Sequence, residues 1–238
     1  MAYPISRLFV KNYKESAELQ YKRNVYKYAL TFANYGFIGN FVVLGIWGNE
    51  VFFRYTMFTL LIGIVCCSWG LFILIPKGQI SFWQGLKKGF LTPPIIALVL
   101  GIIIGLLDLG KCVPSFAMSA LDNAAKCMGP VAMVLAGMVI AEYDVKKLVE
   151  NKKVYVVSLL RLIVIPTVFI LALKALGTSD EIMTFALIAF ATPLGMNTIV
   201  YPAAFGGDTE TGASMTVISS ILSIVTIPIL YYLLIVLL

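Results

Sequence analysis

The stretch Phe190-Ala191-Thr192-Pro193-Leu194-Gly195-Met196-Asn197 decides how this chain folds, because it places helix-breaking residues inside a long apolar run. Pro193 has no backbone N–H to donate, and Gly195 lowers the stability of a helix. Hydrocarbon offers no water to the backbone groups that such a break releases. A break at membrane depth is therefore tolerated only where it lines a cavity or is buried in protein. The stretch predicts an interrupted helix packed against other parts of the chain.

A second stretch with the same plan lies 158 positions earlier, at Phe32-Ala33-Asn34-Tyr35-Gly36-Phe37-Ile38-Gly39-Asn40. Both are followed by an apolar run that ends in glycine and an acidic residue, at Trp47-Gly48-Asn49-Glu50 and at Phe205-Gly206-Gly207-Asp208. Paired interrupted helices in two halves of one chain indicate the binding site of a secondary transporter. We expect the two breaks, near Tyr35–Gly39 and Pro193–Met196, to lie side by side near mid-membrane.

The composition is that of a membrane protein, since 60% of the 238 residues are hydrophobic and 13% are charged. Runs of about 18 or more apolar residues mark candidate transmembrane helices. The predicted fold class is an all-α membrane protein, a multi-pass helical bundle with inverted repeats and two broken crossing helices. The seven expected spans are Tyr26–Trp47, Val51–Ile75, Pro93–Leu109, Pro114–Ala141, Val154–Leu176, Ile182–Phe205 and Ala213–Leu237.

The net charge of +6 follows an alternating pattern along the chain. Lysine and arginine gather in the N-terminal segment 1–24, in the loop 76–91 and around Lys146–Lys153, whereas the intervening turns carry acidic residues. This is the positive-inside pattern, so we expect the three basic regions in the cytoplasm and the C-terminus outside. We therefore expect the positive charge to reflect the orientation of the chain in a lipid bilayer, and we expect no binding to nucleic acid.

The residue types argue against an enzyme. Histidine is absent from the sequence, which removes the most common general base and metal ligand. The sequence also contains no HExxH, P-loop or GxSxG motif and no cluster of aspartates. We therefore predict no catalytic residues, no cofactor and no metal. The four cysteines are interpreted as small apolar side chains, three of them inside apolar segments.

Polar residues and glycines at the two interruptions are the candidate substrate-binding residues. An asparagine amide both donates and accepts hydrogen bonds, and freed N–H groups at the positive end of a half-helix suit an anionic group. The alternative is that the asparagines only form hydrogen bonds between helices. The candidates at the first break are Asn34, Gly36 and Asn40, and those at the second are Pro193, Gly195 and Asn197.

Charged residues inside the apolar segments are further candidates. Asp122 and Lys126 lie four positions apart, where they share a helix face and can neutralise each other. Ionisable residues inside a membrane are functional candidates, so Asp122 joins the candidate site; the alternative is that the pair lies at the outer interface. Arg161 is expected to extend to the cytoplasmic surface. Gly101 and Gly105 have the spacing of close helix packing or of a dimer face.

The order of the segments predicts an inverted repeat. The first and sixth spans enter the membrane from opposite sides, so the two halves of the chain have opposite orientations. The second unit, 92–238, holds five spans, whereas 25–75 holds only the last two helices of the first unit. We therefore expect the chain to be short of three N-terminal helices.

These residues resemble the auxin efflux carrier family. The resemblance covers most of Tyr26–Leu238 and rests on Phe32–Asn40, Thr92–Ala97, Gly129–Met133 and Ala191–Asp208. It implies ten helices in two inverted five-helix repeats, of which seven are present in this chain. The fourth and ninth helices of the family are broken and cross at the substrate site, and they match the first and sixth spans.

The resemblance also implies a substrate and a motion. Family members move small organic anions such as carboxylates, and an elevator-like motion of the crossing bundle against a scaffold is implied. Asn34 matches the polar residue at the first break, and Pro193 and Asn197 match the second. The first break lacks the proline of many family members, so Gly36 and Gly39 are expected to supply its flexibility.

Two functions follow from these observations. The leading one is a secondary efflux carrier of small organic anions that works by alternating access in the cytoplasmic membrane of a prokaryote. A proton or sodium is the candidate coupling ion, and a homodimer is the candidate assembly. The alternative is a non-transporting membrane subunit or truncated remnant that packs against a full-length partner. The first function predicts that Asn34 and Asn197 tolerate little change, and the second that only packing positions matter.

Overall fold

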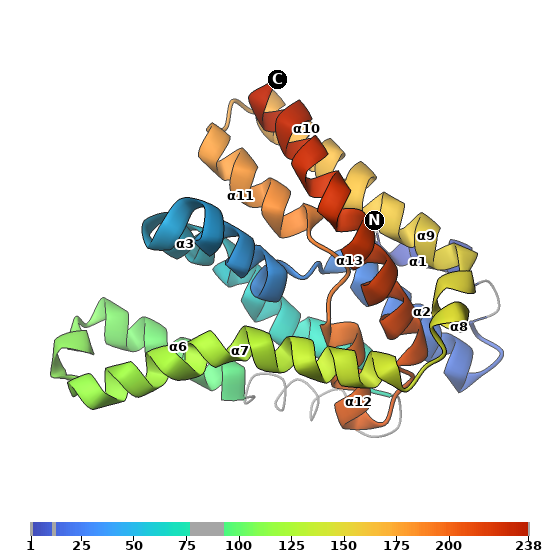
Figure 1. The fold of residues 1–238 in the computed structure, drawn as a ribbon, viewed down its shortest axis with the longest axis horizontal. Helices are drawn as coiled ribbons and strands as arrows, with labels where there is room; N and C mark the ends of the chain where they lie inside the picture. The colour runs from blue at the N-terminus through green and yellow to red at the C-terminus, as the bar shows by residue number, and fades with distance from the viewer. Residues whose placement is uncertain (1, 11–12, 77–92, 238) are drawn as a thin grey trace.

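The computed structural model describes residues 2–10, 13–76 and 93–237, and these residues form helices (Figure 1). Strands are absent from these ranges, and a single antiparallel bridge joins Ala33 to Leu194. Short 3-10 and π-helical turns are labelled η. The elements are α1 (Ala2–Phe9), α2 (Ala17–Thr31), η1 (Tyr35–Gly39), α3 (Asn40–Val65), η2 (Cys66–Gly70), α4 (Leu71–Leu74), α6 (Pro93–Leu106), η3 (Leu109–Cys112), α7 (Ser115–Ala141), α8 (Val145–Glu150), α9 (Lys152–Leu159), η4 (Leu160–Val164), α10 (Ile165–Ala175), α11 (Asp180–Ala191), α12 (Asn197–Phe205), α13 (Glu210–Tyr231) and η5 (Tyr232–Val236).

The first interrupted helix consists of α2 and the helix that begins at η1. The side chain of Ser16 caps α2 by accepting a hydrogen bond from the backbone N–H of Leu19, at 3.1 Å. Residues 32–34 are not helical, and the chain then resumes as the π-helical turn η1. The break therefore lies earlier than the glycines that were expected to form it, and Gly36 and Gly39 sit within the turn that follows. A contact with a distant segment determines the position of the break, because Ala33 pairs with Leu194.

A hairpin follows the first break. The run from η1 to α4 turns back at Gly48, whose φ of 79° lies in the left-handed region that favours glycine. The hydroxyl of Tyr55 donates to the carbonyl of Tyr35 at 3.2 Å, which holds the two arms together. A Cβ added at Gly39 would lie 2.5 Å from the Tyr55 hydroxyl, so this close approach requires a glycine or a shift of the tyrosine.

The second interrupted helix consists of α11 and α12. Residues Thr192–Met196 separate the two. Helix α12 ends at Phe205, and the next residue, Gly206, has a φ of 69°, as expected for a glycine just beyond a helix. The long helix α13 then packs against α12. A Cβ at Gly212 on α13 would clash with the backbone carbonyl group of Thr198, so glycine permits this contact.

Three helices of the described part are long and apolar enough to cross a membrane: Tyr35–Leu74, Lys152–Ala175 and Glu210–Val236. The last two agree with the fifth and seventh predicted spans. The first joins parts of two predicted spans that fold back at Gly48. The first and sixth predicted spans are divided by their interruptions into shorter helices. The chain is thus a helical membrane protein, and the total of seven spans stays a prediction.

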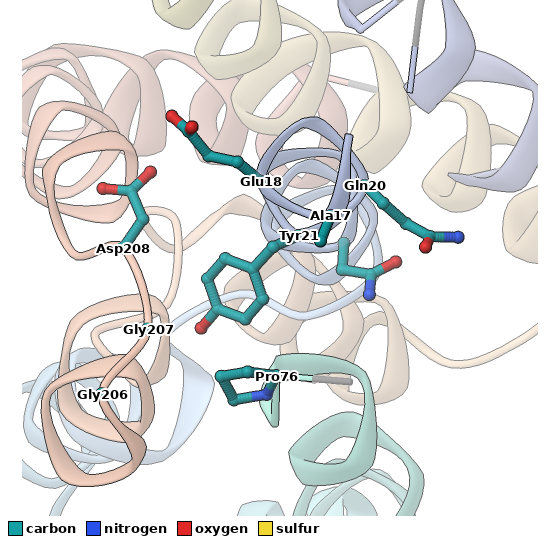
Figure 2. A pocket seen from close by; sticks show the side chains of 9 residues that line it. Ala17, Glu18, Gln20, Tyr21, Pro76, Gly206, Gly207 and Asp208 are labelled. Carbon is teal, nitrogen blue, oxygen red and sulfur yellow. The ribbon is translucent and has the colours of Figure 1, made fainter. Parts of the chain in front are cut away.

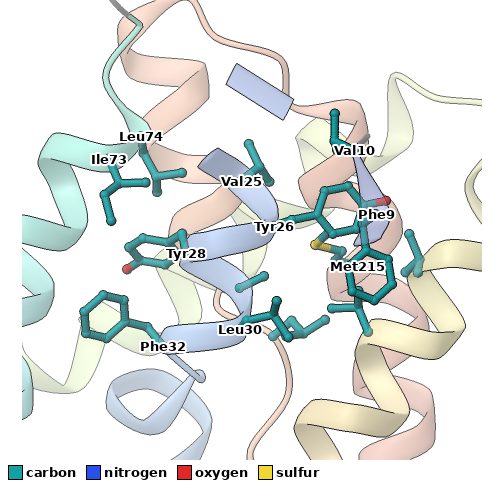
Figure 3. Close-up of a cluster of buried hydrophobic side chains, with 14 of the residues drawn as sticks. Phe9, Val10, Val25, Tyr26, Tyr28, Leu30, Phe32, Ile73, Leu74 and Met215 are labelled. Carbon is teal, nitrogen blue, oxygen red and sulfur yellow. The ribbon is translucent and has the colours of Figure 1, made fainter. Parts of the chain in front are cut away.

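The largest buried cluster surrounds α2 (Figure 3). Figure 3 shows Phe9 and Met215 beside Tyr26, and Ile73 and Leu74 on the side of Tyr28. The rings of Phe9 and Tyr26 stack with centroids 5.2 Å apart, which joins α1 to α2. The N-terminal segment 1–24 therefore contains α1 and the beginning of α2. The predicted basic loop 76–91 lies outside the described residues except for Pro76.

Helices α6 and α7 form a hairpin whose turn extends away from the other helices, whereas α7 also packs against η1, α12 and α13 (Figure 1). Most of their described side chains are exposed, and many of these are large and apolar. A Cβ at Gly101 or Gly105 would meet no atom within 4 Å. These glycines therefore make no close helix contact within the described part of this chain, and the dimer face stays a prediction.

Candidate functional site

The two interruptions lie side by side, as the sequence predicts. Ala33 and Leu194 form an antiparallel bridge, and the backbone N–H of Asn34 donates to the carbonyl of Pro193 at 2.8 Å. Around this point α2 packs against α12, and η1 and α3 pack against α11. We call the four-residue contact of Ala33, Asn34, Pro193 and Leu194 the crossing.

Helix α13 supplies a hydrogen bond to the second break. The hydroxyl oxygen of Ser219 accepts from the N–H of Leu194 at 3.0 Å. Beyond the break, the hydroxyl of Thr198 donates to the carbonyl of Gly195 at 2.8 Å. A buried break needs such partners, because an unpaired backbone group in an apolar environment costs several kcal/mol, about 2–7 on common scales. The second break is thus held in place by its own residues and by α13.

The side-chain amide nitrogen of Asn34 is buried without a hydrogen-bond partner among the described residues. Its side chain is 3% exposed, and its Nδ2 atom finds no hydrogen-bond acceptor among the described residues. Its backbone carbonyl accepts from Ile38 and Gly39, so the residue also caps the helix that begins at η1. Thr192 at the second break is fully buried, and its hydroxyl likewise has no partner in the described part. Most buried polar groups in proteins have a hydrogen-bond partner, so each of these two groups is open to a bound water or a ligand.

Asn197 lies at the start of α12 and contacts α2. Its amide nitrogen donates to the hydroxyl of Tyr28 at 2.7 Å and approaches the Sγ atom of Cys66 at 3.5 Å. The Tyr28 hydroxyl and the Cys66 thiol lie 3.0 Å apart, so the three polar groups form one buried cluster. The sequence interpretation overlooked Tyr28 and treated Cys66 as an apolar side chain. The sequence signal for this cluster is Tyr28 itself, a tyrosine that lies about one turn before the end of α2 and hence close to the break.

The remaining candidates lie outside the crossing. Asn40 begins α3 and is partly exposed, and a Cβ at Gly36 would meet no atom within 4 Å. The Cβ position of Gly195 is 3.7 Å from the carbonyl oxygen of Ala33, an ordinary contact distance. Asp122 pairs with Lys126 at 2.5 Å, as its spacing predicts, and both side chains are exposed. At about 1.5 Å per residue, Asp122 lies roughly 27 Å along α7 from Ile140, where that helix joins the cluster around Met196.

Arg161 does not extend to a surface. Its side chain is 1% exposed in the π-helical turn η4, the middle of the long helix Lys152–Ala175. Its Nη2 atom donates to the carbonyl of Thr31 at 3.5 Å, and its Cζ atom lies 5.7 Å from the centre of the Phe190 ring. The expectation of a surface position is wrong because this face of η4 packs against the ends of α2 and α11. Position along the helix alone does not reveal that packing.

A cavity of about 260 Å³ lies where α2 begins (Figure 2). Figure 2 shows Tyr21 of α2 between the Gly206–Asp208 loop and Pro76, with Glu18 beside it. The hydroxyl of Tyr21 donates to the carbonyl of Leu74 at 2.9 Å, and burial together with the charge of Asp208 raises the pKa of Tyr21. The carboxylates of Glu18 and Asp208 line this cavity and would repel an anion. The candidate site therefore remains the crossing.

The described fold defines a class: a helical membrane protein in which two interrupted helices meet at their breaks. A family model described as "Membrane transport protein" matches residues 80–231, which is more than half of the chain. The chain therefore belongs to this family of membrane transporters, the auxin efflux carrier family. The matched residues include the second break and not the first. Neither the curated proteins nor the solved structures gave a match.

Proposed function

We propose that this chain is a secondary transporter of small organic anions that works by alternating access and binds its substrate at the crossing. The observation that carries the proposal is the amide nitrogen of Asn34, which has no partner in the described part of the chain and lies beside the hydrogen bond between Asn34 and Pro193. An anionic oxygen placed there would accept from Nδ2 of Asn34. The hydroxyl of Thr192 is a second donor that needs a partner.

Charge supports an anion over a cation as the substrate. The helix that begins at η1 and the helix α12 both start at the breaks, and the N-terminal end of a helix carries partial positive charge. The described residues bury two arginines, Arg23 and Arg161, and no aspartate or glutamate. A carboxylate is the simplest ligand that fits this balance.

We also propose that the two interrupted helices are equivalent elements of an inverted repeat. Their antiparallel bridge at Ala33 and Leu194 is the relationship expected of two helices that enter a membrane from opposite sides. The proposed substrate contacts are Asn34, Pro193, Gly195 and Asn197, with Gly36 and Asn40 one turn behind the first break. We leave Asp122 outside this site, because it is exposed and paired with Lys126.

The second candidate function is a membrane subunit that packs against a full-length partner. The exposed apolar hairpin of α6 and α7 favours it, because a large apolar surface of this kind is normally covered by a partner protein or by lipid. Lipid covers the same surface equally well. The two functions differ in what they require of Asn34, whose amide nitrogen matters for a substrate and forms no hydrogen bond with the described residues of the hairpin.

A binding experiment tests the proposal. The full chain in detergent is screened against small mono- and dicarboxylates by thermal shift, and the carboxylate with the largest effect is then titrated. Asn34→Leu should weaken its binding about ten- to a hundred-fold, since a lost hydrogen bond to a charged group is worth about 1.5–3 kcal/mol. Asn49→Leu, at an exposed asparagine, is the matched control and should leave the affinity unchanged. Equal binding by both variants would place the substrate elsewhere.

A further inference from the structure

Arg161 is a buried charge without an acidic partner among the residues that the structure describes. It is the largest fully buried side chain, and none of the ion pairs within the described part of the chain includes it. Burying an uncompensated guanidinium is very unfavourable, so something in its surroundings must balance the charge. Its Nε atom also has no hydrogen-bond partner among the described residues.

The surroundings of Arg161 are the C-terminal ends of two half-helices. Thr31, whose carbonyl accepts from Nη2, is the last residue of α2. Phe190, whose ring faces the guanidinium, is the second-to-last residue of α11. The last carbonyls of a helix lack partners within it and carry the negative end of the helix dipole. Each end is equivalent to roughly half a negative charge, so two such ends balance about one guanidinium.

In carriers with discontinuous helices, half-helix C-terminal ends and unwound carbonyls are where coupling cations bind. We propose that Arg161 is a fixed counter-charge that takes the electrostatic role of such a cation, so that the crossing binds its anion without co-bound sodium. This inference rests on the proposed transport function. Arg161 then has a positioning role. Its charge neutralises the C-terminal ends of α2 and α11, and the positive ends of α12 and of the helix that begins at η1 face the substrate.

The local backbone and the residue type both suit this role. The π-helical turn η4 inserts an extra residue into a helix that is otherwise α-helical, which changes the direction of the side chains there. Arginine remains charged when buried and is more weakly hydrated than lysine. Its planar guanidinium also stacks on aromatic rings, as it does near Phe190.

Thermal unfolding of the full chain in detergent, without substrate, tests the inference. Unfolding temperatures are compared in sodium chloride, in choline chloride of equal ionic strength, and in choline chloride with guanidinium at a non-denaturing, low millimolar concentration. The unmodified chain should unfold at the same temperature in all three. Arg161→Ala should unfold on the order of 4–8 °C lower in choline chloride, and sodium or guanidinium should restore part of the loss. Arg54→Ala removes an exposed arginine and should show no such recovery.

Three results would overturn the inference. They are a sodium-specific stabilisation of the unmodified chain, an Arg161→Ala variant as stable as the unmodified chain, and a destabilised variant that no cation restores. If Arg161→Ala does not fold, Arg161→Lys and Arg161→Gln replace it, and only the glutamine variant should depend on added cations; equal behaviour of the two would count against the role. Because no substrate is present, these outcomes are independent of the carboxylate titration with Asn34→Leu, which tests the transport function itself.

Discussion

The hydroxyl oxygen of Ser219 on α13 lies 3.0 Å from the backbone nitrogen of Leu194 and accepts its hydrogen bond. This contact joins a continuous helix to the break of another helix. Both residues are fully buried, so no water replaces the bond. The geometry of the second break therefore depends on a residue 25 positions away on α13.

Ser219→Ala should destabilise the chain by about 1–3 kcal/mol, because the N–H of Leu194 is left buried without an acceptor. Ser223→Ala is the control on the same helix. Among the described residues, the hydroxyl of Ser223 donates only to the carbonyl of Ser220 within α13, so its loss should have a much smaller effect. Unfolding in detergent measures both. Equal losses would mean that the bond to Leu194 does not support the break.

Gly212→Ala should displace α12 from α13. The added Cβ would overlap the backbone carbonyl group of Thr198, and backbone atoms cannot rotate aside as a flexible side chain does. We expect a loss of about 1–3 kcal/mol, typical of overpacking. Gly45→Ala on α3 is the control, since a Cβ there meets no atom within 4 Å, and alanine is the better helix former. An unchanged unfolding temperature for Gly212→Ala would contradict the close packing of the two helices.

Tyr28 and Asn197 should be energetically coupled. The amide of Asn197 donates to the hydroxyl of Tyr28 at 2.7 Å, and Cys66 contacts both. In a double-mutant cycle of Tyr28→Phe and Asn197→Leu, we expect a coupling energy of about 0.5–3 kcal/mol in the free energy of unfolding. Tyr232→Phe with Asn197→Leu, at an exposed tyrosine, should be additive. Additive effects in the first pair would mean that the cluster contributes no stability.

The sequence was sufficient to predict the features that depend on local chemistry. The spans ending near Ala175 and Val236 follow from apolar length, and the interruption at Pro193 follows from a missing donor. The first break was placed a few residues too late, because the pairing of Ala33 with Leu194, and not the glycines, determines its position.

Contacts between distant segments could not be predicted in this way. Arg161 has no local signal that separates a buried arginine from one that reaches a surface, and its burial follows from how η4 packs against α2 and α11. The role of Ser219 is invisible for the same reason. By contrast, the pairing of Asp122 with Lys126 depends only on helical spacing, and the sequence was enough to predict it.

The adjacency of the two breaks makes a covalent test possible. In an antiparallel bridge the Cβ atoms of paired residues lie about 4.5–5.5 Å apart, and small backbone adjustments bring this close to the separation in a disulfide. Ala33→Cys with Leu194→Cys, in a chain whose four native cysteines are replaced by serine, should therefore form a disulfide on mild oxidation. Peptide mapping by mass spectrometry detects the link.

Ala33→Cys with Asp122→Cys serves as the control pair and should not cross-link within one chain, because Asp122 is exposed on α7, far from the crossing. The cross-linked chain also distinguishes two kinds of motion at the crossing. If the crossing moves as one body, as an elevator-like mechanism requires, then the cross-linked chain should still bind the carboxylate found with the unmodified chain. If the two breaks must separate during binding, the disulfide should abolish it. A failure of the Ala33–Leu194 pair to cross-link, with both cysteines reactive toward maleimide, would refute the crossing on which the proposed site depends.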